Sequence, residues 1–357
     1  MTDAHDALAL SRGPALPNRM MLAPLTNLQS HADGTLSEDE FIWLTKRAQG
    51  GFGLTMTCAA HVQAIGQGFP GQLGIFSDEH LPGLIRLASA LNAEGGVSSV
   101  QLHHAGMRSP AELIGEAPVS ASEQAEFGAR ALSGEEVEAM IEAFIRGAER
   151  AEAAGFHGVE LHGAHGYLLC QFLSAETNRR EDPFGGTLAN RMRPLLQIID
   201  GIRARCAPTF QLGVRLSPER FGMTLDDATA VAQRLLVEEK IDYLDLSLWD
   251  VRKKALDAPE VDLIDPFMAL PRGRVAVGVA GKINSGEDVR YALGKGADFV
   301  LLGRAAILHH DFPKRLAADE NFQAATLPVT RAHLVAEGLG PKFVDYMATW
   351  KGFVEEA

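Results

Sequence analysis

Two histidines and a tyrosine follow the apolar segment Gly158–Leu161, at the point where a buried strand would end. His162 and His165 can present two imidazole N–H donors to one oxygen atom, and Tyr167 can offer a phenolic proton from nearby. Such donors stabilise the negative charge that develops on a carbonyl oxygen, and a phenol can protonate the neighbouring carbon. These residues therefore predict a site that polarises a carbonyl group. The structural alternative is that the histidines cap the strand and bond loop carbonyls.

A second pattern lies nearer the C-terminal end of the chain. Segment 278–286 (GVAGKINSG) ends an apolar strand and opens a helical pattern, and Gly303-Arg304 ends the next strand. Glycines such as Gly281 let backbone N–H groups approach a phosphate closely, a helix N-terminus adds positive potential, and the Arg304 guanidinium offers paired donors. The two segments together predict a phosphate site. Tight turns with a structural arginine are the alternative.

Three further polar side chains stand in or after apolar strands, namely Thr26, Gln101 and Arg215. Thr26 follows Pro24, which ends the first strand, and Gln101 lies near the end of the third. An arginine inside an apolar strand is costly unless its guanidinium meets an anion or hydrogen-bond acceptors. A hydroxyl, an amide and a guanidinium suit a ring edge that carries carbonyl and N–H groups. For Arg215, a buried structural ion pair is an equally open interpretation.

Short apolar segments alternate with helical patterns along the whole chain. The predicted strands are Arg19–Ala23, Leu54–Thr57, Val97–Leu102, Gly158–Leu161, Gln211–Leu216, Tyr243–Ser247, Val275–Val279 and Phe299–Leu302. The predicted helices are Ser37–Ala48, Asp78–Ala93, Ser133–Ala154, Asp226–Glu239 and Glu287–Leu293. Strands that are apolar on both faces are typical of a buried parallel sheet. The alternation predicts an α/β fold, a (β/α)8 (TIM) barrel that forms a single domain over residues 1–357. A doubly wound open sheet is the alternative, but no G-x-G-x-x-G follows the first strand.

Three connections between these elements are long: His103–Leu132, Gly163–Ala189 and Leu248–Arg274. All three leave the C-terminal ends of predicted strands, where barrels of this kind build their active sites. The segment after Asp311 is predicted to form C-terminal helices that pack on the barrel.

The formal net charge of −13 argues against nucleic acid or an anionic membrane as the main partner. Cys58, Cys170 and Cys206 lie far apart, which predicts neither a disulfide framework nor a cysteine metal cluster. The first residues lack the pattern of a secretory signal, and no apolar run approaches the ~20 residues that a membrane helix needs. We therefore expect a cytoplasmic protein that acts on a small molecule, with a homo-oligomer left open.

Several of these segments together resemble the old yellow enzyme family of flavin-dependent ene-reductases. The resemblance rests on segment 18–26 (NRMMLAPLT), on segment 101–106 (QLHHAG) and on the long block Gly158–Arg193, and the Gly303-Arg304 ending fits it as well. The block contains HGAHGYL, QFLS, NRR and FGG. The matching segments cover nearly the whole chain in barrel order.

The resemblance implies bound FMN, reduced by NADH or NADPH, and an activated C=C bond of an enone or enal as the acceptor. It places Pro24, Leu25, Thr26, Ala60, Gln101 and Arg215 at the flavin ring, and Gly281, Gly303 and Arg304 at its phosphate. His162 and His165 would bind the substrate carbonyl, and Tyr167 would be the proton donor. Trp249 is expected to line the substrate cavity. Leu28 and Phe184 depart from the aromatic residues common in relatives, and Lys253 and Lys254 are expected in a solvated loop.

Two other functions remain open from the residues alone. His103, His162 and His165 could be ligands of a metal-dependent barrel hydrolase, although no carboxylate is predicted to join them at the strand ends. A barrel that binds phosphate without redox activity is the other candidate. Both alternatives predict a colourless protein, whereas a flavoprotein is yellow.

Overall fold

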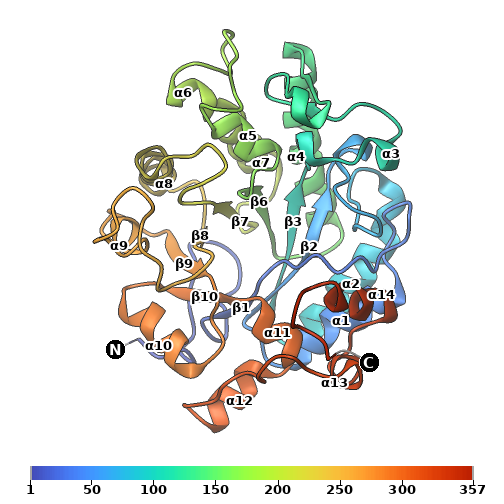
Figure 1. Cartoon of the computed structure of the whole chain (residues 1–357), viewed down its shortest axis with the longest axis vertical. Helices are drawn as coiled ribbons and strands as arrows, with labels where there is room; N and C mark the ends of the chain where they lie inside the picture. The colour runs from blue at the N-terminus through green and yellow to red at the C-terminus, as the bar shows by residue number, and fades with distance from the viewer. Residues whose placement is uncertain (1, 356–357) are drawn as a thin grey trace.

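A closed barrel of eight parallel strands forms the centre of the computed structural model, which describes residues 2–355. Around the barrel the strands follow the order β1-β10-β9-β8-β7-β6-β3-β2 (Figure 1). Their bounds are β1 (Met20–Leu22), β2 (Leu54–His61), β3 (Val97–His103), β6 (Gly158–Gly163), β7 (Gln211–Leu216), β8 (Tyr243–Ser247), β9 (Ala276–Ala280) and β10 (Phe299–Leu302). All eight predicted strands are present, which confirms the barrel and excludes the open sheet. The largest change at an end is in β2, which continues to His61.

Helices cover the outside of the barrel, as Figure 1 shows. The five predicted helices correspond to α1 (Glu38–Gln49), α2 (Leu81–Ala93), α4 (Gly134–Ala153), α8 (Leu225–Glu238) and α10 (Gly286–Gly294). Ser37, Ser133 and Ser285 cap three of them through their side chains, and Ser133 and Glu136 form the capping box that the sequence indicates. The sequence patterns did not predict α7 (Arg193–Arg205), which packs against α4.

The three long connections carry short elements of their own. The connection after β3 contains α3 (Ala111–Ile114) and two short strands, β4 (Val119–Ser120) and β5 (Arg130–Ala131), which pair with each other outside the barrel. The connection after β6 contains α5 (Leu168–Leu173) and α6 (Leu188–Arg191). The connection after β8 contains α9 (Asp265–Met268).

Four short helices follow the last strand, as expected. They are α11 (Arg304–Leu308), α12 (Phe312–Ala318), α13 (Arg331–Ala336) and α14 (Pro341–Ala348). In Figure 1, α14 lies beside α1 and α2. The ring of Phe343 in α14 meets that of Trp43 in α1 edge to face, with 4.8 Å between the ring centroids. This contact anchors the end of the chain on the barrel.

Apolar side chains fill the interior of the barrel, and residues of a turn near the N-terminus extend this apolar cluster. Leu8 and Leu16 pair across this turn and join Met21, Leu54 and Phe299 in one buried cluster. A second, larger apolar cluster fills the space between the strands and the surrounding helices. The polar groups of the site must therefore lie above the interior cluster, towards the C-terminal ends of the strands.

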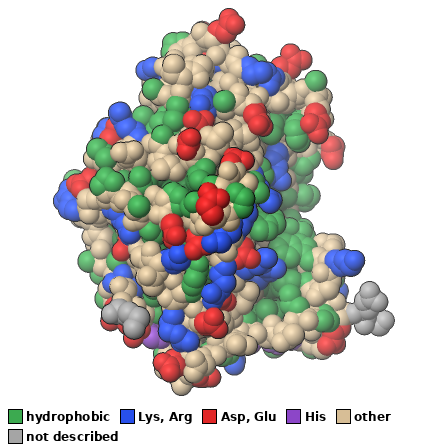
Figure 2. Space-filling view, turned by 60° about the vertical axis from the view of Figure 1, so that its left-hand side comes forward, with side chains coloured by type: hydrophobic (Ala, Val, Ile, Leu, Met, Phe, Trp, Pro, Cys, Tyr) green, Lys and Arg blue, Asp and Glu red, His purple; other side chains and the backbone are tan. Residues whose placement is uncertain are grey.

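On the face shown in Figure 2, acidic and basic side chains lie interspersed among hydrophobic ones. No helix within residues 2–355 is long and apolar enough to cross a membrane.

Candidate active site

A cavity of about 910 Å³ lies at the C-terminal ends of the barrel strands. It brings together residues from loops that are far apart in the sequence. With one exception, every predicted site residue lines it: Pro24, Leu25, Thr26, Gln101, His162, His165, Tyr167, Arg215, Trp249, Gly281, Gly303 and Arg304. Leu28 and Phe184, the two departures from the family pattern, are not among its lining residues.

The exception is Ala60. The pairing of β2 with β3 shifts between Met56 and Ala59, so the side chains beyond the shift change face. Ala59 consequently lines the cavity, whereas Ala60 is completely buried in the outer apolar cluster. The place at the cavity wall that was predicted for Ala60 is therefore taken by the neighbouring residue, Ala59.

The two histidines after β6 contact each other directly. His162 Nε2 lies 2.8 Å from His165 Nδ1, and His165 Nε2 lies 2.7 Å from the Ser247 hydroxyl. One ring donates to the other here, so the two N–H groups do not both point at a common third atom. The Tyr167 ring lies edge-on to His162, with 5.0 Å between centroids. The Arg108 guanidinium stands over the Tyr167 ring at 4.6 Å.

Burial keeps these histidines neutral. Desolvation lowers the pKa of His165 to about 3, with Arg215 and Arg108 lowering it further through their charge. The pKa of His162 is lowered well below its usual value, first by desolvation and then by His165 and His103. Each ring therefore carries a single N–H at neutral pH.

His103 adds a third imidazole, and its protonated nitrogen can be assigned from its neighbours. Gln72 donates one N–H to the Ala59 carbonyl at 2.7 Å and accepts from the Gly68 N–H at 2.6 Å, which fixes the orientation of its amide. Its second N–H is then donated to His103 Nδ1 at 3.1 Å. Because desolvation lowers the pKa of His103 and keeps the ring neutral, the proton sits on Nε2, which has no hydrogen-bond partner among residues 2–355.

Gln101 and Arg215 stand between the cavity and two buried carboxyl groups. Gln101 Nε2 donates to Glu160 Oε1 at 2.8 Å, and Arg215 Nε lies 2.9 Å from Asp245 Oδ2. The glutamate and the aspartate are both completely buried. Arg215 thus makes the structural ion pair and lines the cavity as well, while its contact with a flavin ring stays a prediction.

The opposite end of the cavity carries the glycine-rich segments. A side chain at Gly281 would clash with the backbone of Asp250, whose nitrogen would lie 2.7 Å from an added Cβ. Lys282 pairs with Asp250 at 3.0 Å. Arg304 opens α11, and its guanidinium has neither a hydrogen bond nor an ion pair with the residues that the structure describes. A free guanidinium beside two glycines is well suited to bind a phosphate.

The rim of the cavity contains residues that the sequence patterns did not single out. They are Arg108, Arg220, Phe221, Tyr346 and Trp350. Trp249 has 64% of its surface exposed, and both Trp249 and Arg220 have positive φ angles, 69° and 70°. Left-handed backbone at such residues is uncommon and marks them as loop positions held by their surroundings.

The lining is strongly cationic, although the chain as a whole is acidic. It includes Arg108, Arg215, Arg220, Lys282 and Arg304, but no Asp or Glu. Lys253 and Lys254 lie in the loop after β8 and do not line the cavity. Lys254 is exposed, whereas Lys253 is partly buried and pairs with Glu219.

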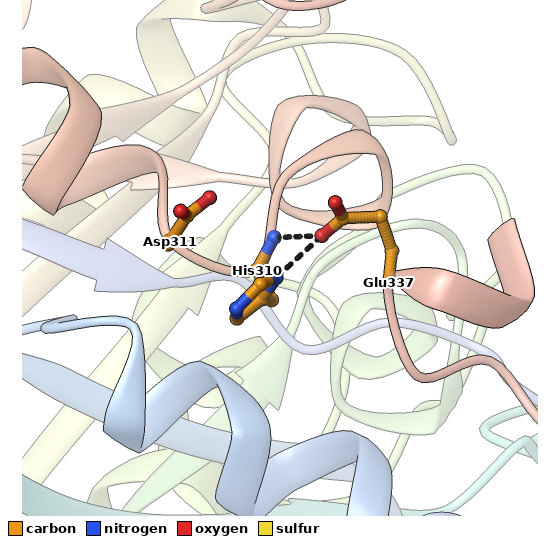
Figure 3. Close-up of side chains that lie close together, drawn as sticks. All are labelled: His310, Asp311 and Glu337. Carbon is orange, nitrogen blue, oxygen red and sulfur yellow. Dashed lines mark hydrogen bonds and ion pairs between the residues drawn. The ribbon is translucent and has the colours of Figure 1, made fainter. Parts of the chain in front are cut away.

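The three histidines do not form a metal site in this arrangement. Within residues 2–355, the only cluster of potential metal ligands consists of His310, Asp311 and Glu337 (Figure 3). The His310 backbone N–H and Nδ1 both lie 2.6 Å from one Glu337 oxygen, and Asp311 pairs with Arg315 at 2.7 Å. These contacts already account for the polar side chains of the cluster.

Comparison with known proteins decides the family. The sequence model of the NADH:flavin oxidoreductase / NADH oxidase family matches residues 13–323. The chain belongs to the old yellow enzyme family. It is 34% identical over 331 residues to "Probable NADH-dependent flavin oxidoreductase YqiG" of Bacillus subtilis, and the match covers 88% of each chain. It is 32% identical over 321 residues to an NADPH dehydrogenase of Bacillus licheniformis, covering 87% of this chain and 93% of that one.

A solved structure of an old yellow enzyme homologue supports the same family assignment. The old yellow enzyme homologue from Zymomonas mobilis superposes with a TM-score of 0.81 at 25% identity, covering 97% of this chain and 99% of that one. Old yellow enzymes are oxidoreductases that use FMN with NADH or NADPH as the reductant. The cavity fits FMN chemically, because its lining includes Arg304, whose guanidinium has no partner among the described residues, and the polar groups of Gln101 and Arg215.

Proposed function

We propose that this old yellow enzyme reduces the activated C=C bond of α,β-unsaturated carbonyl compounds. The observation that carries the proposal is that His162, His165 and Tyr167 line the same cavity as Gly281, Gly303 and the Arg304 guanidinium. Bound FMN would supply the hydride, from N5 to the β-carbon of the acceptor. The remaining chemistry belongs to side chains of this chain.

The cofactor would be held at two places. Pro24, Leu25, Thr26, Gln101 and Arg215 would bind the ring, and Gly281, Gly303 and Arg304 the phosphate. Thr26 offers a hydroxyl and Arg215 a permanent charge at the ring edge. A cationic wall without carboxylates favours the phosphates of FMN and of the nicotinamide nucleotide alike.

His162 and His165 would bind the acceptor carbonyl oxygen. An incoming oxygen replaces the bond between the two rings, and each ring then turns one N–H towards it. Because both side chains are buried, these bonds act in a medium of low dielectric and oppose charge that builds up on the oxygen. Removal of one such donor typically lowers the rate by about 10²–10³.

Tyr167 would deliver the proton to the α-carbon. Its ring packs against His162 and His103, which places the phenol beside the proposed carbonyl site. A tyrosine hydroxyl is protonated at neutral pH and can act as a general acid. Trp249 and Phe221 would form the outer wall against which the acceptor packs.

The visible absorption spectrum of the purified protein tests the proposal. We expect flavin bands that bleach when NADPH is added without oxygen and return when 2-cyclohexenone follows. Bands that bleach but do not return with the enone would leave an FMN oxidoreductase with another acceptor. A colourless protein that takes up no FMN would contradict both the cofactor and the reaction.

Two further proposals concern the domain organisation and the cellular location of the protein. We propose that the chain is a single domain, since one barrel core is continuous with its surrounding helices. We also propose a cytoplasmic location, because the reductants NADH and NADPH are used there.

A further inference from the structure

Glu160 and Asp245 form a buried carboxyl pair directly behind the cavity wall. Both side chains have no exposed surface, and they come from the neighbouring parts of β6 and β8, with Arg215 of β7 between them. The Arg215 guanidinium lies 2.9 Å from Asp245, whereas the neighbours of Glu160 are two neutral groups, the Gln101 amide, which donates a hydrogen bond to it, and the Tyr243 hydroxyl. Oxygen Oε2 of Glu160 accepts no hydrogen bond of good geometry from the residues that the structure describes.

The charges in this space do not balance if both carboxyl groups are ionised. The groups that face the pair are Arg215 and His162 from β7 and β6, Tyr243 from β8, and the uncharged Gln101 and Ser99 from β3. Burial keeps His162 neutral, so Arg215 is the single cation for two carboxylates. A buried and unpaired carboxylate costs several kcal/mol, which a proton removes. One carboxyl group must therefore be protonated, and the group without the ion pair is Glu160.

The surroundings raise the pKa of both carboxyl groups. Burial raises the pKa of Glu160, and the charge of Asp245 raises it further, while Arg215 and Gln101 act against this. Burial also raises the pKa of Asp245, opposed by Arg215. Asp245 thus stays ionised because Arg215 is fully available to it.

Reduction of the cofactor changes that balance, since the hydride from the nicotinamide nucleotide adds two electrons and one proton and leaves a net negative charge. Arg215 lines the cavity, so its charge would then be divided between the cofactor and Asp245. A new anion near a carboxylate disfavours its ionised form.

We propose that Asp245 takes up one proton from solvent when the cofactor is reduced, while Glu160 stays protonated throughout. The uptake keeps the net charge around Arg215 constant. When the hydride leaves for the acceptor, Asp245 returns the proton to solvent, so that protons and electrons balance over the cycle. Asp245 acts here through Arg215, as a positioning residue, and does not touch the substrate. The inference rests on the proposed function, because it requires the flavin ring to lie over Arg215.

Two measurements on the FMN-loaded protein test the inference without turnover. We expect the reduced-minus-oxidised infrared spectrum to gain a carboxylic acid C=O band that shifts in D₂O. We also expect the midpoint potential to fall by about 60 mV per pH unit near neutral pH, since each proton taken up with two electrons contributes about 30 mV. The ultraviolet spectrum of the reduced protein shows whether the cofactor itself stays anionic over the same range.

Variants then assign the proton. Asp245→Asn should lose the new infrared band and halve the slope to about 30 mV per pH unit, whereas Glu160→Gln, which mimics a protonated glutamate, should keep both. Asp242→Asn is the matched control, because Asp242 lies directly before the same strand and is equally buried, but pairs with Arg12 and Arg203. It should behave like the parent protein.

Three results would overturn the inference: a parent protein without the new band, an Asp245→Asn variant that keeps it, or a Glu160→Gln variant that loses it. If a variant does not fold, the infrared spectrum of the parent protein still tests the inference, because a parent protein without the new band would overturn it. Failure of the underlying flavin placement looks different. Arg215→Lys would then change neither the flavin spectrum nor the potential, whereas a cofactor over Arg215 would respond in both.

Discussion

Replacement of Arg304 by glutamine should weaken FMN binding by one to two orders of magnitude. The Arg304 guanidinium has no partner among the described residues, so no internal contact is lost in the free protein and none offsets the change. A hydrogen bond to a charged group contributes about 1.5–3 kcal/mol. At about 1.4 kcal/mol per tenfold change, this corresponds to a loss of roughly 10- to 150-fold in affinity.

Riboflavin makes the assay specific, because it shares the ring of FMN and lacks the phosphate. Titration of the apoprotein, followed by quenching of flavin fluorescence, gives both dissociation constants. We expect the preference for FMN over riboflavin to shrink in Arg304→Gln, with riboflavin affinity unchanged. Arg220→Gln is the matched control, since Arg220 also lines the cavity and makes no hydrogen bond or ion pair through its side chain with the described residues, but its guanidinium lies over the Trp249 ring and not in the Gly303-Arg304 segment. An unchanged FMN preference in Arg304→Gln would refute the phosphate assignment.

Three further predictions concern the rest of the site. Tyr167→Phe should retain FMN and its reduction by NADPH but slow reoxidation by 2-cyclohexenone by about 10²- to 10⁴-fold in stopped-flow experiments; an equal rate would mean that water supplies the proton. A para-substituted phenol should give a long-wavelength charge-transfer band with the oxidised protein, and His162→Ala should weaken its binding by about tenfold or more; a parent protein with no band would count against the histidine pair. Stability to denaturant should fall by on the order of 3 kcal/mol from pH 6.5 to 5, because burial lowers the pKa of His61, His103, His104, His162 and His165. Only the unfolded chain takes up those protons as the pH falls below 6.5, and the raised pKa values of Glu40, Glu160 and Asp245 offset part of the loss. A flat profile would show that the histidines are accessible to protons in the folded protein.

The barrel could be predicted because its strands are buried on both faces and therefore read as continuous apolar segments. The capped start of α4 was equally clear, since Ser133 and Glu136 bond to each other's backbone locally. The helix α7 was missed although its sequence carries a signal, since the buried residues Leu195, Ile198, Ile199 and Ile202 follow helical spacing. Strand ends shifted by a few residues where pairing with a neighbouring strand, such as β2 with β3, extends the ladder beyond the apolar core.

The sequence motifs predicted which residues line the site, but not the contacts that depend on strand register and side-chain rotamers. Ala60 was placed at the flavin ring by resemblance to the family, and a motif match does not reveal the shift in β2 that turns the Ala59 side chain inward. The mutual bond between His162 and His165 depends on side-chain rotamers, and the partner of His103 comes from Gln72 in a distant loop. The carboxyl pair was missed for a similar reason, since Glu160 and Asp245 approach each other only when β6 and β8 pair with opposite sides of β7.

The pairing of β1 also bears on how the chain reaches this fold. β1 joins β10 on one side and β2 on the other, and Arg19 near the start of the chain bonds to the Asp298 carbonyl across 279 positions. During synthesis, β1 therefore leaves the ribosome long before β10 has been made. The apolar residues Met20–Leu22 cannot pair with β10 until that last strand has been synthesised. Contacts of such separation are slow to form because a long loop must close first. Barrel closure is thus expected to be the late, rate-limiting step of folding, with the flavin cavity appearing only when the two ends of the chain have met.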